Sequence, residues 1–334
     1  MKFCSKCVLP DTFPGIHFDE HGVCNYCHHS QLPDQERKQE YIRAFEDLLD
    51  SVRGKHSFDV LVAYSGGKDS TYTMYQLANK YKLNVLAFTF DNGFISEKAR
   101  ENIIKMSDLC GATSLIVRPP FPKLKKIFQV AATKDLYSAK TLDRASSICT
   151  TCIGHVKAIA LKTAMEKNIP LVAWGWSPGQ APIASAIRHT SPQLQSISHR
   201  TVRDKILENS NELKSYFLSD EDLKIPQERW PINIHPLAFM DYDEEEIFKL
   251  IKSLGWEHPK DLDPNSTNCK LNALANYLHR ERYNFHPYAW EVAGIVRAGG
   301  IPREEGVAKT TEDESMPMVK YAADVLGIDL KNSA

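Results

Sequence analysis

The chain has 334 residues, of which 43% are hydrophobic and 25% are charged, a composition typical of folded globular proteins. Disordered, fibrous and collagen-like classes are excluded, and the length predicts roughly two domains. The formal net charge of −1 offers no long-range attraction to polyanions, which argues against a long nucleic-acid backbone as the main ligand. We find no signal peptide and no apolar stretch of about 18 residues, so we expect a cytoplasmic protein with no membrane partner.

Four of the eight cysteines lie near the N-terminus, in two closely spaced pairs. Cys4 and Cys7 form the first pair, and sixteen residues separate it from the second, Cys24 and Cys27. Two pairs at this spacing are typical of a zinc knuckle, in which two tight turns each supply two thiolates to one tetrahedral Zn²⁺. We expect this metal to stabilise the fold and to take no part in catalysis.

Downstream of the knuckle, the hydrophobic pattern predicts strands that alternate with helices. Apolar runs predict buried strands at 58–64, 84–90, 114–117 and 170–174, and helices are predicted at 35–52, 70–81, 96–110 and 152–167. This alternation predicts an α/β fold with a doubly wound, Rossmann-like parallel sheet. Beyond residue 175 the pattern weakens, and we expect a loop over 176–200 and helices over 200–218 and 244–254.

The predicted organisation therefore has four segments. They are a zinc-binding knuckle (1–30), a linking helix (31–54), an ATP-binding α/β domain (55–200) and a mainly helical region for substrate or partner (201–334).

The first predicted buried strand of the α/β domain ends in Ser65-Gly-Gly-Lys-Asp-Ser70. Where such a strand turns into a helix, free backbone N–H groups bind anions, and Lys68 adds a positive charge. The spacing differs from that of a Walker loop, which has four residues between its glycines. The motif instead resembles the PP-loop of ATP pyrophosphatases, in the adenine nucleotide α-hydrolase superfamily, and the resemblance extends from about residue 55 to residue 180.

This resemblance implies an enzyme that cleaves ATP between the α- and β-phosphates and transfers AMP to a carbonyl or carboxylate oxygen, which can then leave. It implies that Mg²⁺ is shared among the phosphates and that seven consecutive residues hold the pyrophosphate, namely Ser65, Gly66, Gly67, Lys68, Asp69, Ser70 and Thr71. Lys68 and Asp69 are expected to be catalytic. Asp91 and Gly175 follow later strands, at positions where such proteins usually contact adenosine.

A third cysteine pair, Cys149 and Cys152, lies within the domain that resembles the superfamily. A pair at this spacing fits a redox dithiol, a persulfide carrier or part of a metal site. The tRNA-thiolating branches of the superfamily have such a pair at the mouth of the ATP site, and a distant third cysteine there completes a three-thiolate site for a [4Fe–4S] cluster. The resemblance assigns that position to Cys269, and it implies that the open iron holds a nucleophilic sulfide. The less favoured alternatives are a persulfide carried by the cysteine pair and, for Cys269, the role of a small buried hydrophobic residue.

The N-terminus is also similar to that of N-acetyl sugar amidotransferases, over about the first ninety residues. The matching segments are Phe3 to Thr12, Gly15 to Glu20 and Gly22 to Cys27. These proteins use ammonia from a partner glutaminase to convert an acetamido group into an acetamidine. An ammonia nucleophile does not need the third cysteine pair, so we favour a sulfurtransferase. Its expected acceptor is a nucleotide, a nucleobase or another small amide, with tRNA less favoured. A sulfur donor such as a cysteine desulfurase is the expected partner, and a homodimer is a further expectation.

Four further residues are candidates for substrate binding: Trp176, Arg188, Arg280 and Arg282. Aromatic and guanidinium groups together suit stacking on a base and binding a phosphate. For the two C-terminal arginines, the alternative is a helix and turn that pack against the main domain.

Overall fold

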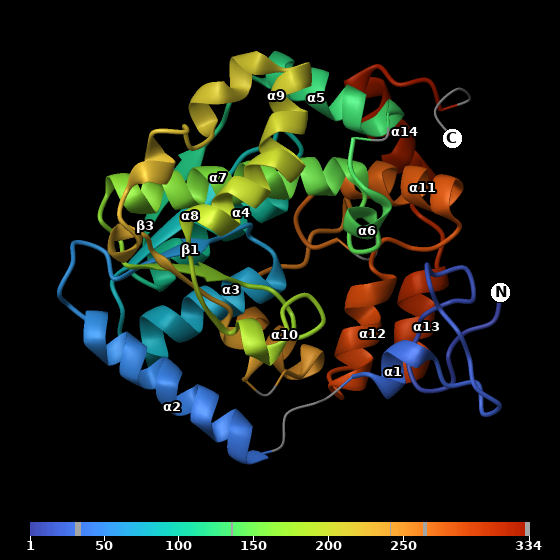
Figure 1. Cartoon of the computed structure of the whole chain (residues 1–334), viewed down its shortest axis with the longest axis horizontal. Helices are drawn as coiled ribbons and strands as arrows, with labels where there is room; N and C mark the ends of the chain where they lie inside the picture. The colour runs from blue at the N-terminus through green and yellow to red at the C-terminus, as the bar shows by residue number, and fades with distance from the viewer. Residues whose placement is uncertain (31–34, 135, 241, 263–265, 331–334) are drawn as a thin grey trace.

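The computed structural model describes residues 1–30, 35–134, 136–240, 242–262 and 266–330. Figure 1 shows a sheet with helices on both faces. The strands described are β1 (Val60–Ala63), β2 (Val85–Phe90), β3 (Thr113–Val117), β4 (Leu171–Trp174), β5 (Ile187–His189) and β6 (Ile232–Ile234). Their order is β3-β2-β1-β4-β6-β5, and β5 is antiparallel to β6 whereas the other pairs are parallel. The predicted doubly wound α/β sheet is confirmed, with one antiparallel edge strand.

The helices described are distributed along the whole chain. They are α1 (Asn25–His28), α2 (Gln35–Val52), α3 (Lys68–Tyr75), α4 (Glu97–Leu109), α5 (Phe121–Thr133), α6 (Ala139–Leu142), α7 (Ser147–Glu166), α8 (Pro192–Ser198), α9 (Asp204–Asn209), α10 (Glu244–Ser253), α11 (Asn272–Tyr283), α12 (Ala289–Arg297), α13 (Arg303–Thr311) and α14 (Met316–Leu326). None of the described helices is long and apolar enough to cross a membrane.

The two faces of the sheet are buried in different hydrophobic cores. Alternate side chains of a strand point to opposite faces, so Leu61 packs with α5, α7 and α11, while its neighbours Val60 and Val62 pack with α2, α3 and α4. Strands that are buried on both sides read as continuous apolar runs. This explains why the sequence pattern located β1, β2 and β4 within a few residues. The fourth predicted strand, β3, was also located, although it lies at an edge of the sheet and is partly exposed.

The structure corrects the expectations for the region after β4. The segment 176–200, expected to be loop, contains β5 and α8, and 200–218 is divided between a π-helical turn (His199–Arg203), α9 and a 3-10 turn (Asn211–Tyr216). Strands of three residues are too short for a detectable alternation, so neither β5 nor β6 stands out in the sequence. Helix α7 begins at Ser147 rather than at 152, because the Ser146 hydroxyl caps it by accepting from the Cys149 N–H group.

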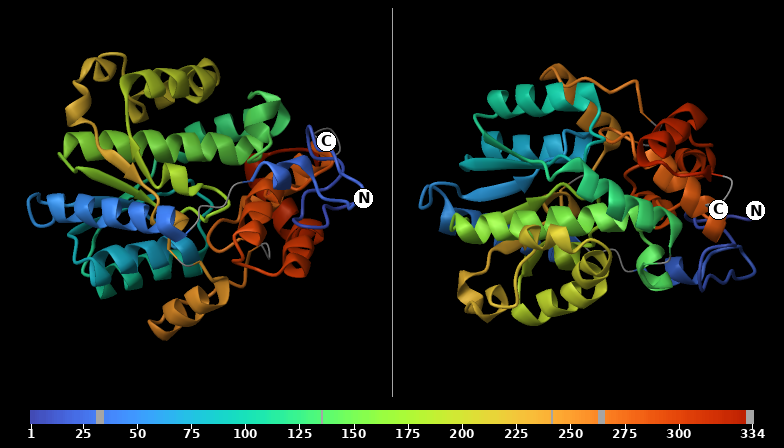
Figure 2. Two further views of the ribbon diagram at one scale, coloured as in Figure 1. Left: turned by 60° about the horizontal axis from the view of Figure 1, so that its bottom comes forward. Right: turned by 90° about the horizontal axis from the view of Figure 1, so that it is seen from above.

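The N-terminal segment packs against the C-terminal helices rather than standing alone. Figures 1 and 2 show the N-terminal coil beside α12 and α13, and Phe13, Phe285 and Val292 share one hydrophobic cluster with the N-terminal cysteines. The Arg303 guanidinium donates to the carbonyl oxygens of Cys4, at 2.7 Å, and Cys7, at 3.1 Å. The first and last parts of the chain therefore form one packed unit, and the predicted domain boundaries remain predictions.

Candidate functional site

The phosphate loop lies at the carboxyl end of β1, where the chain turns into α3. Gly66 has a φ of +79°, and a Cβ atom there would lie 2.7 Å from the carbonyl oxygen of Ala99, so the turn requires glycine. The Ser65 and Ser70 hydroxyls lie 3.1 Å apart, and the Thr71 hydroxyl donates to the Gly67 carbonyl at 2.8 Å. The loop thus presents backbone N–H groups and hydroxyls at a helix start, which is an arrangement that binds anions.

A polar network surrounds the lysine of this loop. The Lys68 ammonium donates to the Asp69 carboxylate at 2.8 Å and to the Tyr242 hydroxyl at 2.7 Å, and it lies 3.6 Å from Glu244. Burial lowers the pKa of Lys68, but the charges of Asp69 and Glu244 outweigh this effect and hold the pKa above its usual value. The lysine is therefore charged. The sequence pattern did not identify its two distant partners, the carboxylate of Glu244 at the start of α10 and the hydroxyl of Tyr242, two residues before that helix.

A third carboxylate, Glu291 on α12, faces the same network. The Ser177 hydroxyl donates to it at 3.0 Å. Burial, and after it the negative charge of Asp69, raises the pKa of Glu291 to about 7, from a usual 4.5. Since a charged Glu291 would lie near two other carboxylates, the folded protein favours its protonated form.

Glu291→Gln is expected to stabilise the protein at alkaline pH. The folded state binds the Glu291 proton more tightly than the unfolded state does, so the free energy of unfolding falls as the pH rises from 4.5 through 7, by at most about 3 kcal/mol. A neutral amide removes this contribution. Thermal unfolding between about pH 5 and pH 8 measures the change. Glu281→Gln, at an exposed position of α11, is the control, and identical pH profiles of the Glu291→Gln variant and the unchanged protein would contradict the assignment.

Two residues expected near adenosine lie beside the loop and β2. Gly175 follows β4, and a Cβ atom on it would lie 2.6 Å from the backbone Cα of Ser70, so β4 can approach the loop only with glycine there. Asp91 follows β2, is 2% exposed at its side chain, and pairs with Arg100 at 3.0 Å and more loosely with Arg118 at 3.6 Å. Both residues are at the expected edge of the sheet, and their contact with adenosine stays a prediction.

The structure brings Cys149, Cys152 and Cys269 together. The first two lie in the first turns of α7, and Cys269 forms an antiparallel bridge with Ile95, in the segment that follows β2. The side-chain amide of Asn92 donates to both Cys152, at 3.6 Å, and Cys269, at 3.5 Å. Cys269 therefore lies in one half-buried group of thiols with Cys149 and Cys152, although more than a hundred residues separate them in the sequence.

Two asparagines support these thiols and were missed in the sequence. Asn92 directly follows Asp91, and Asn272 on α11 donates to Cys149 at 4.0 Å and also to the Tyr288 hydroxyl. The sequence offered one indication of each: Asn92 directly follows Asp91, and Asn272 lies three residues after Cys269. Burial raises the pKa of Cys149 to about 11 and also raises those of Cys152 and Cys269. Without a bound cation these thiols are therefore protonated at neutral pH.

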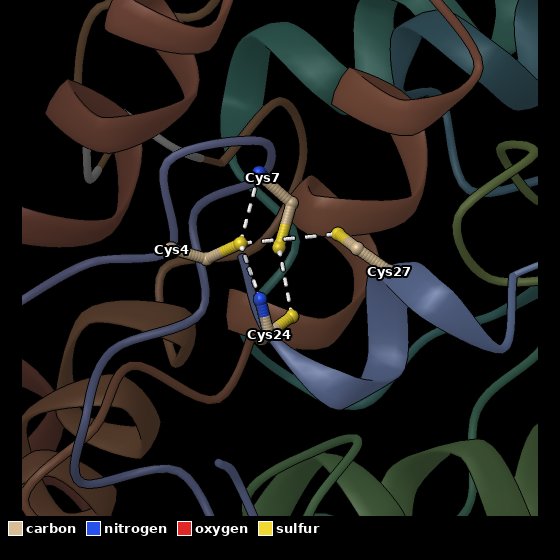
Figure 3. A group of neighbouring side chains, drawn as sticks. All are labelled: Cys4, Cys7, Cys24 and Cys27. Atoms are coloured by element: carbon tan, nitrogen blue, oxygen red, sulfur yellow. Dashed lines mark hydrogen bonds between the residues drawn. The ribbon is translucent and has the colours of Figure 1, made fainter. Parts of the chain in front are cut away.

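The four N-terminal cysteines form a second, tighter group. Figure 3 shows their side chains pointing toward one another, and the sulfur atoms all lie within 4.8 Å of one another. Cys4 and Cys27 are 3.9 Å apart, and Cys7 and Cys24 are 3.8 Å apart. A tetrahedral ion with metal–sulfur bonds of about 2.3 Å places its thiolates about 3.8 Å apart. The group therefore has the geometry for a single tetrahedral metal ion.

The four candidate substrate residues lie in two separate places. Trp176 and Arg188 line a cavity beside β4 and β6. Arg280 pairs with Glu314 at 3.2 Å, and Arg282 donates to the Ala132 carbonyl. Because both of these guanidinium groups bind other parts of the protein, the structure offers no support for their role in substrate binding, which stays a prediction.

The chain is similar to proteins of known and unknown activity. No family model matches it. An uncharacterized protein of Methanocaldococcus jannaschii is 23% identical over 320 residues, which cover 95% of this chain and 96% of that relative. A tRNA(Ile)-lysidine synthase of Buchnera aphidicola is 41% identical over 63 residues, which cover 19% of this chain and 14% of the synthase.

Two solved structures are distant likenesses. The U34-tRNA thiolase NcsA of Methanococcus maripaludis, with its [4Fe–4S] cluster, has a TM-score of 0.38 and 17% identity, and the match covers 100% of this chain and 91% of that chain. NMN synthetase of Francisella tularensis has a TM-score of 0.35 and 13% identity, with 66% and 75% coverage.

The chain has a buried strand, a glycine-containing loop and a helix start at the carboxyl edge of a parallel sheet, which is where open α/β sheets bind their ligands. The chain has the loop motif and the Rossmann-like fold of PP-loop ATP pyrophosphatases, and the local match to a lysidine synthase supports this superfamily.

Proposed function

We propose that the protein is an ATP-dependent thiolation enzyme. ATP binds with its phosphates on loop 65–71, AMP is transferred to a carbonyl oxygen of the acceptor with release of pyrophosphate, and sulfur replaces the oxygen as AMP leaves. The acceptor is a nucleotide, a nucleobase or another small amide, with tRNA as the less favoured class. The observation that carries this proposal is the convergence of Cys149, Cys152 and Cys269 beside the phosphate loop.

The segment that carries Cys269 also contacts the loop. A Cβ atom on Gly67 would lie 2.7 Å from the Thr267 hydroxyl, and the carbonyl of Asn268 accepts from the Ser96 N–H group at 3.0 Å. Cys269 is therefore only two residues from a direct contact with the loop. This short connection supports a reaction in which the oxygen activated by AMP and the incoming sulfur meet at one edge of the sheet.

The three thiols suit a [4Fe–4S] cluster better than a single ion. Among the described residues, the N-terminal cysteines are the group whose ligand atoms are close enough together for one metal ion, and these three thiols do not form such a group. A single tetrahedral ion would require about 3.8 Å, whereas a four-iron cluster holds its ligands further apart. A bound cluster with three cysteine ligands would supply positive charge that keeps the thiols deprotonated and one open iron for sulfide.

The loop and its neighbours have the groups that the first step needs. Lys68 would neutralise phosphate charge, together with Mg²⁺ shared among the phosphates, and the hydroxyls of Ser65 and Ser70 would donate to phosphate oxygens. The buried Thr71 hydroxyl donates to the Gly67 carbonyl and would support the loop from within α3. A sulfur donor such as a cysteine desulfurase would restore the sulfur that each turnover consumes.

Anaerobic purification and reconstitution test the proposal. We expect about four iron and four sulfide per chain, broad visible absorption, and AMP and pyrophosphate formation that depends on the acceptor. Radioactive sulfide supplied with ATP should label pooled nucleotides or nucleobases, and pooled tRNA is tested in parallel. Colourless protein after reconstitution, with AMP formation that depends on ammonia, would contradict thiolation and favour the sugar amidotransferase with its glutaminase.

For the N-terminal cysteines we propose structural Zn²⁺. Cys24→Ser is expected to lose about one zinc per chain and to lower the melting temperature by about 5 °C or more, because the knuckle packs against α12 and α13. Metal analysis and thermal unfolding measure the two effects. Cys110→Ala, at a cysteine outside both groups, should retain the zinc. Full zinc content in Cys24→Ser would rule out this site.

A further inference from the structure

A cavity of about 190 Å³ opens between α7, α8 and the strands β5 and β6. Helix α7 contributes Gly154, Lys157, Ala158 and Leu161, which share one face because a helix repeats every 3.6 residues. The same repeat places Cys149 and Cys152 on roughly the opposite face of α7. The cavity is therefore separate from the group of thiols.

Positive charge lines this cavity without matching negative charge. Its described lining contains Lys157 and Arg188 but no aspartate or glutamate, and neither of these cations forms an ion pair within the described part of the chain. A third cation, Arg203, is already paired with Asp204 and Asp220. Although Lys157 is open to solvent, desolvation and then the charge of Arg188 lower its pKa to about 8. Two neighbouring cations that repel each other would both be stabilised by a bound anion.

The wall beside these cations is aromatic. The rings of Trp176 and His235 stack with centroids 5.0 Å apart and an interplanar angle of 26°, and the Lys157 ammonium lies 4.6 Å from the Trp176 ring centre. His199 is 7% exposed and lines the cavity with its Nδ1 atom lacking any hydrogen-bond partner. A buried polar atom without a partner is costly, so a ligand group that binds it would be stabilising.

We infer that this cavity binds a small planar ligand that carries a carboxylate or a phosphate group. An engineered cavity of roughly 150 Å³ binds benzene, so a cavity of about 190 Å³ accommodates one ring with its anionic group reaching Lys157 and Arg188 at the opening. Trp174 and Trp176 flank Gly175, which packs against the phosphate loop, so the aromatic wall adjoins the proposed ATP site. The binding itself does not depend on thiolation.

Calorimetric titration of the full-length protein tests this site with two matched pairs of probes, orotate against uracil and phenyl phosphate against phenol. We expect the charged member of at least one pair to bind one-to-one and at least tenfold more tightly than its neutral partner. Inorganic phosphate, which has no ring to stack on Trp176, should bind more weakly than that charged ligand. Binding should persist when the protein is saturated with ATP.

Variants assign the binding to the cavity. Lys157→Gln and Arg188→Gln should each weaken it at least tenfold, whereas Arg200→Gln, an exposed cation next to His199 that does not line the cavity, should not change it. Circular dichroism checks that each variant is folded. Equal affinity for charged and neutral probes, retained affinity in folded Lys157→Gln and Arg188→Gln, or displacement by ATP would each overturn the inference. Since no turnover is measured, its failure is distinct from a failure of the thiolation proposal.

Discussion

Lys68→Ala is expected to reduce the release of pyrophosphate from ATP by roughly a thousandfold, the effect of removing a preorganised charge from a phosphate-transfer site. The ammonium is the cation at the centre of the network formed by Asp69, Tyr242 and Glu244. Without it, ATP would bring its negative phosphates next to the Asp69 carboxylate with no lysine between them, while Glu244 keeps the Lys309 ammonium at 3.0 Å. Pyrophosphate formation in a coupled assay, at saturating ATP and Mg²⁺, measures the loss.

Stability must be followed in the same variant, because Lys68→Ala leaves Asp69 and Glu244 without their shared partner. Lys68→Arg keeps the positive charge and so separates the loss of stability from the loss of activity. This variant should remain as stable as the unchanged protein, while the displaced charge still slows the reaction. Lys167→Ala, at an exposed position just beyond α7, is the matched lysine control. Normal pyrophosphate release from folded Lys68→Ala would mean that the loop is not the phosphate site.

Cys269→Ala is expected to lose most of the cluster iron and to lower sulfur transfer at least about a hundredfold, because a cluster ligand contributes more than the outer partners whose removal costs about 10–100-fold. The zinc proposed for the N-terminal cysteines should remain, since the two groups of cysteines share no residue. Iron, sulfide and zinc analyses, visible spectra and transfer of labelled sulfur are measured on one preparation.

The residual activity of Cys269→Ala is also informative. Pyrophosphate release should fall far less than sulfur transfer does, because the phosphate loop itself is unchanged. Cys110→Ala is the control, since this cysteine is half-buried away from both groups. If Cys269→Ala kept its iron and its sulfur transfer, Cys269 would be a small hydrophobic residue and not a ligand.

Local motifs allowed much of this site to be predicted. The two N-terminal cysteine pairs and the turn at 65–70 depend on spacings of a few residues, and such spacings determine which backbone and side-chain groups lie together whatever the rest of the chain does. Strands β1, β2 and β4 were predictable for a similar reason, because burial on both faces requires an unbroken apolar run. The family resemblance, rather than the spacing of the residues, suggested that Cys149, Cys152 and Cys269 belong to one site.

Other features depend on contacts between distant segments. Tyr242 and Glu244 reach Lys68 across more than 170 positions, and Asn92 meets Cys269 only because the segment after β2 pairs with the segment before α11. The cavity beside Lys157 likewise needs β5, a three-residue edge strand with no sequence signature.

The sequence by itself therefore determined the α/β class, the glycine-containing turn at 65–70 and the two N-terminal cysteine pairs, because each is encoded by residues close together in the sequence. Only the tertiary structure decided the carboxylates around Lys68, the packing of the N-terminal cysteines on α12 and α13, and the two cations beside Trp176. The physical reason is that these arrangements follow from the packing of whole helices and strands, whose relative positions minimise the free energy of the entire chain and leave no local pattern.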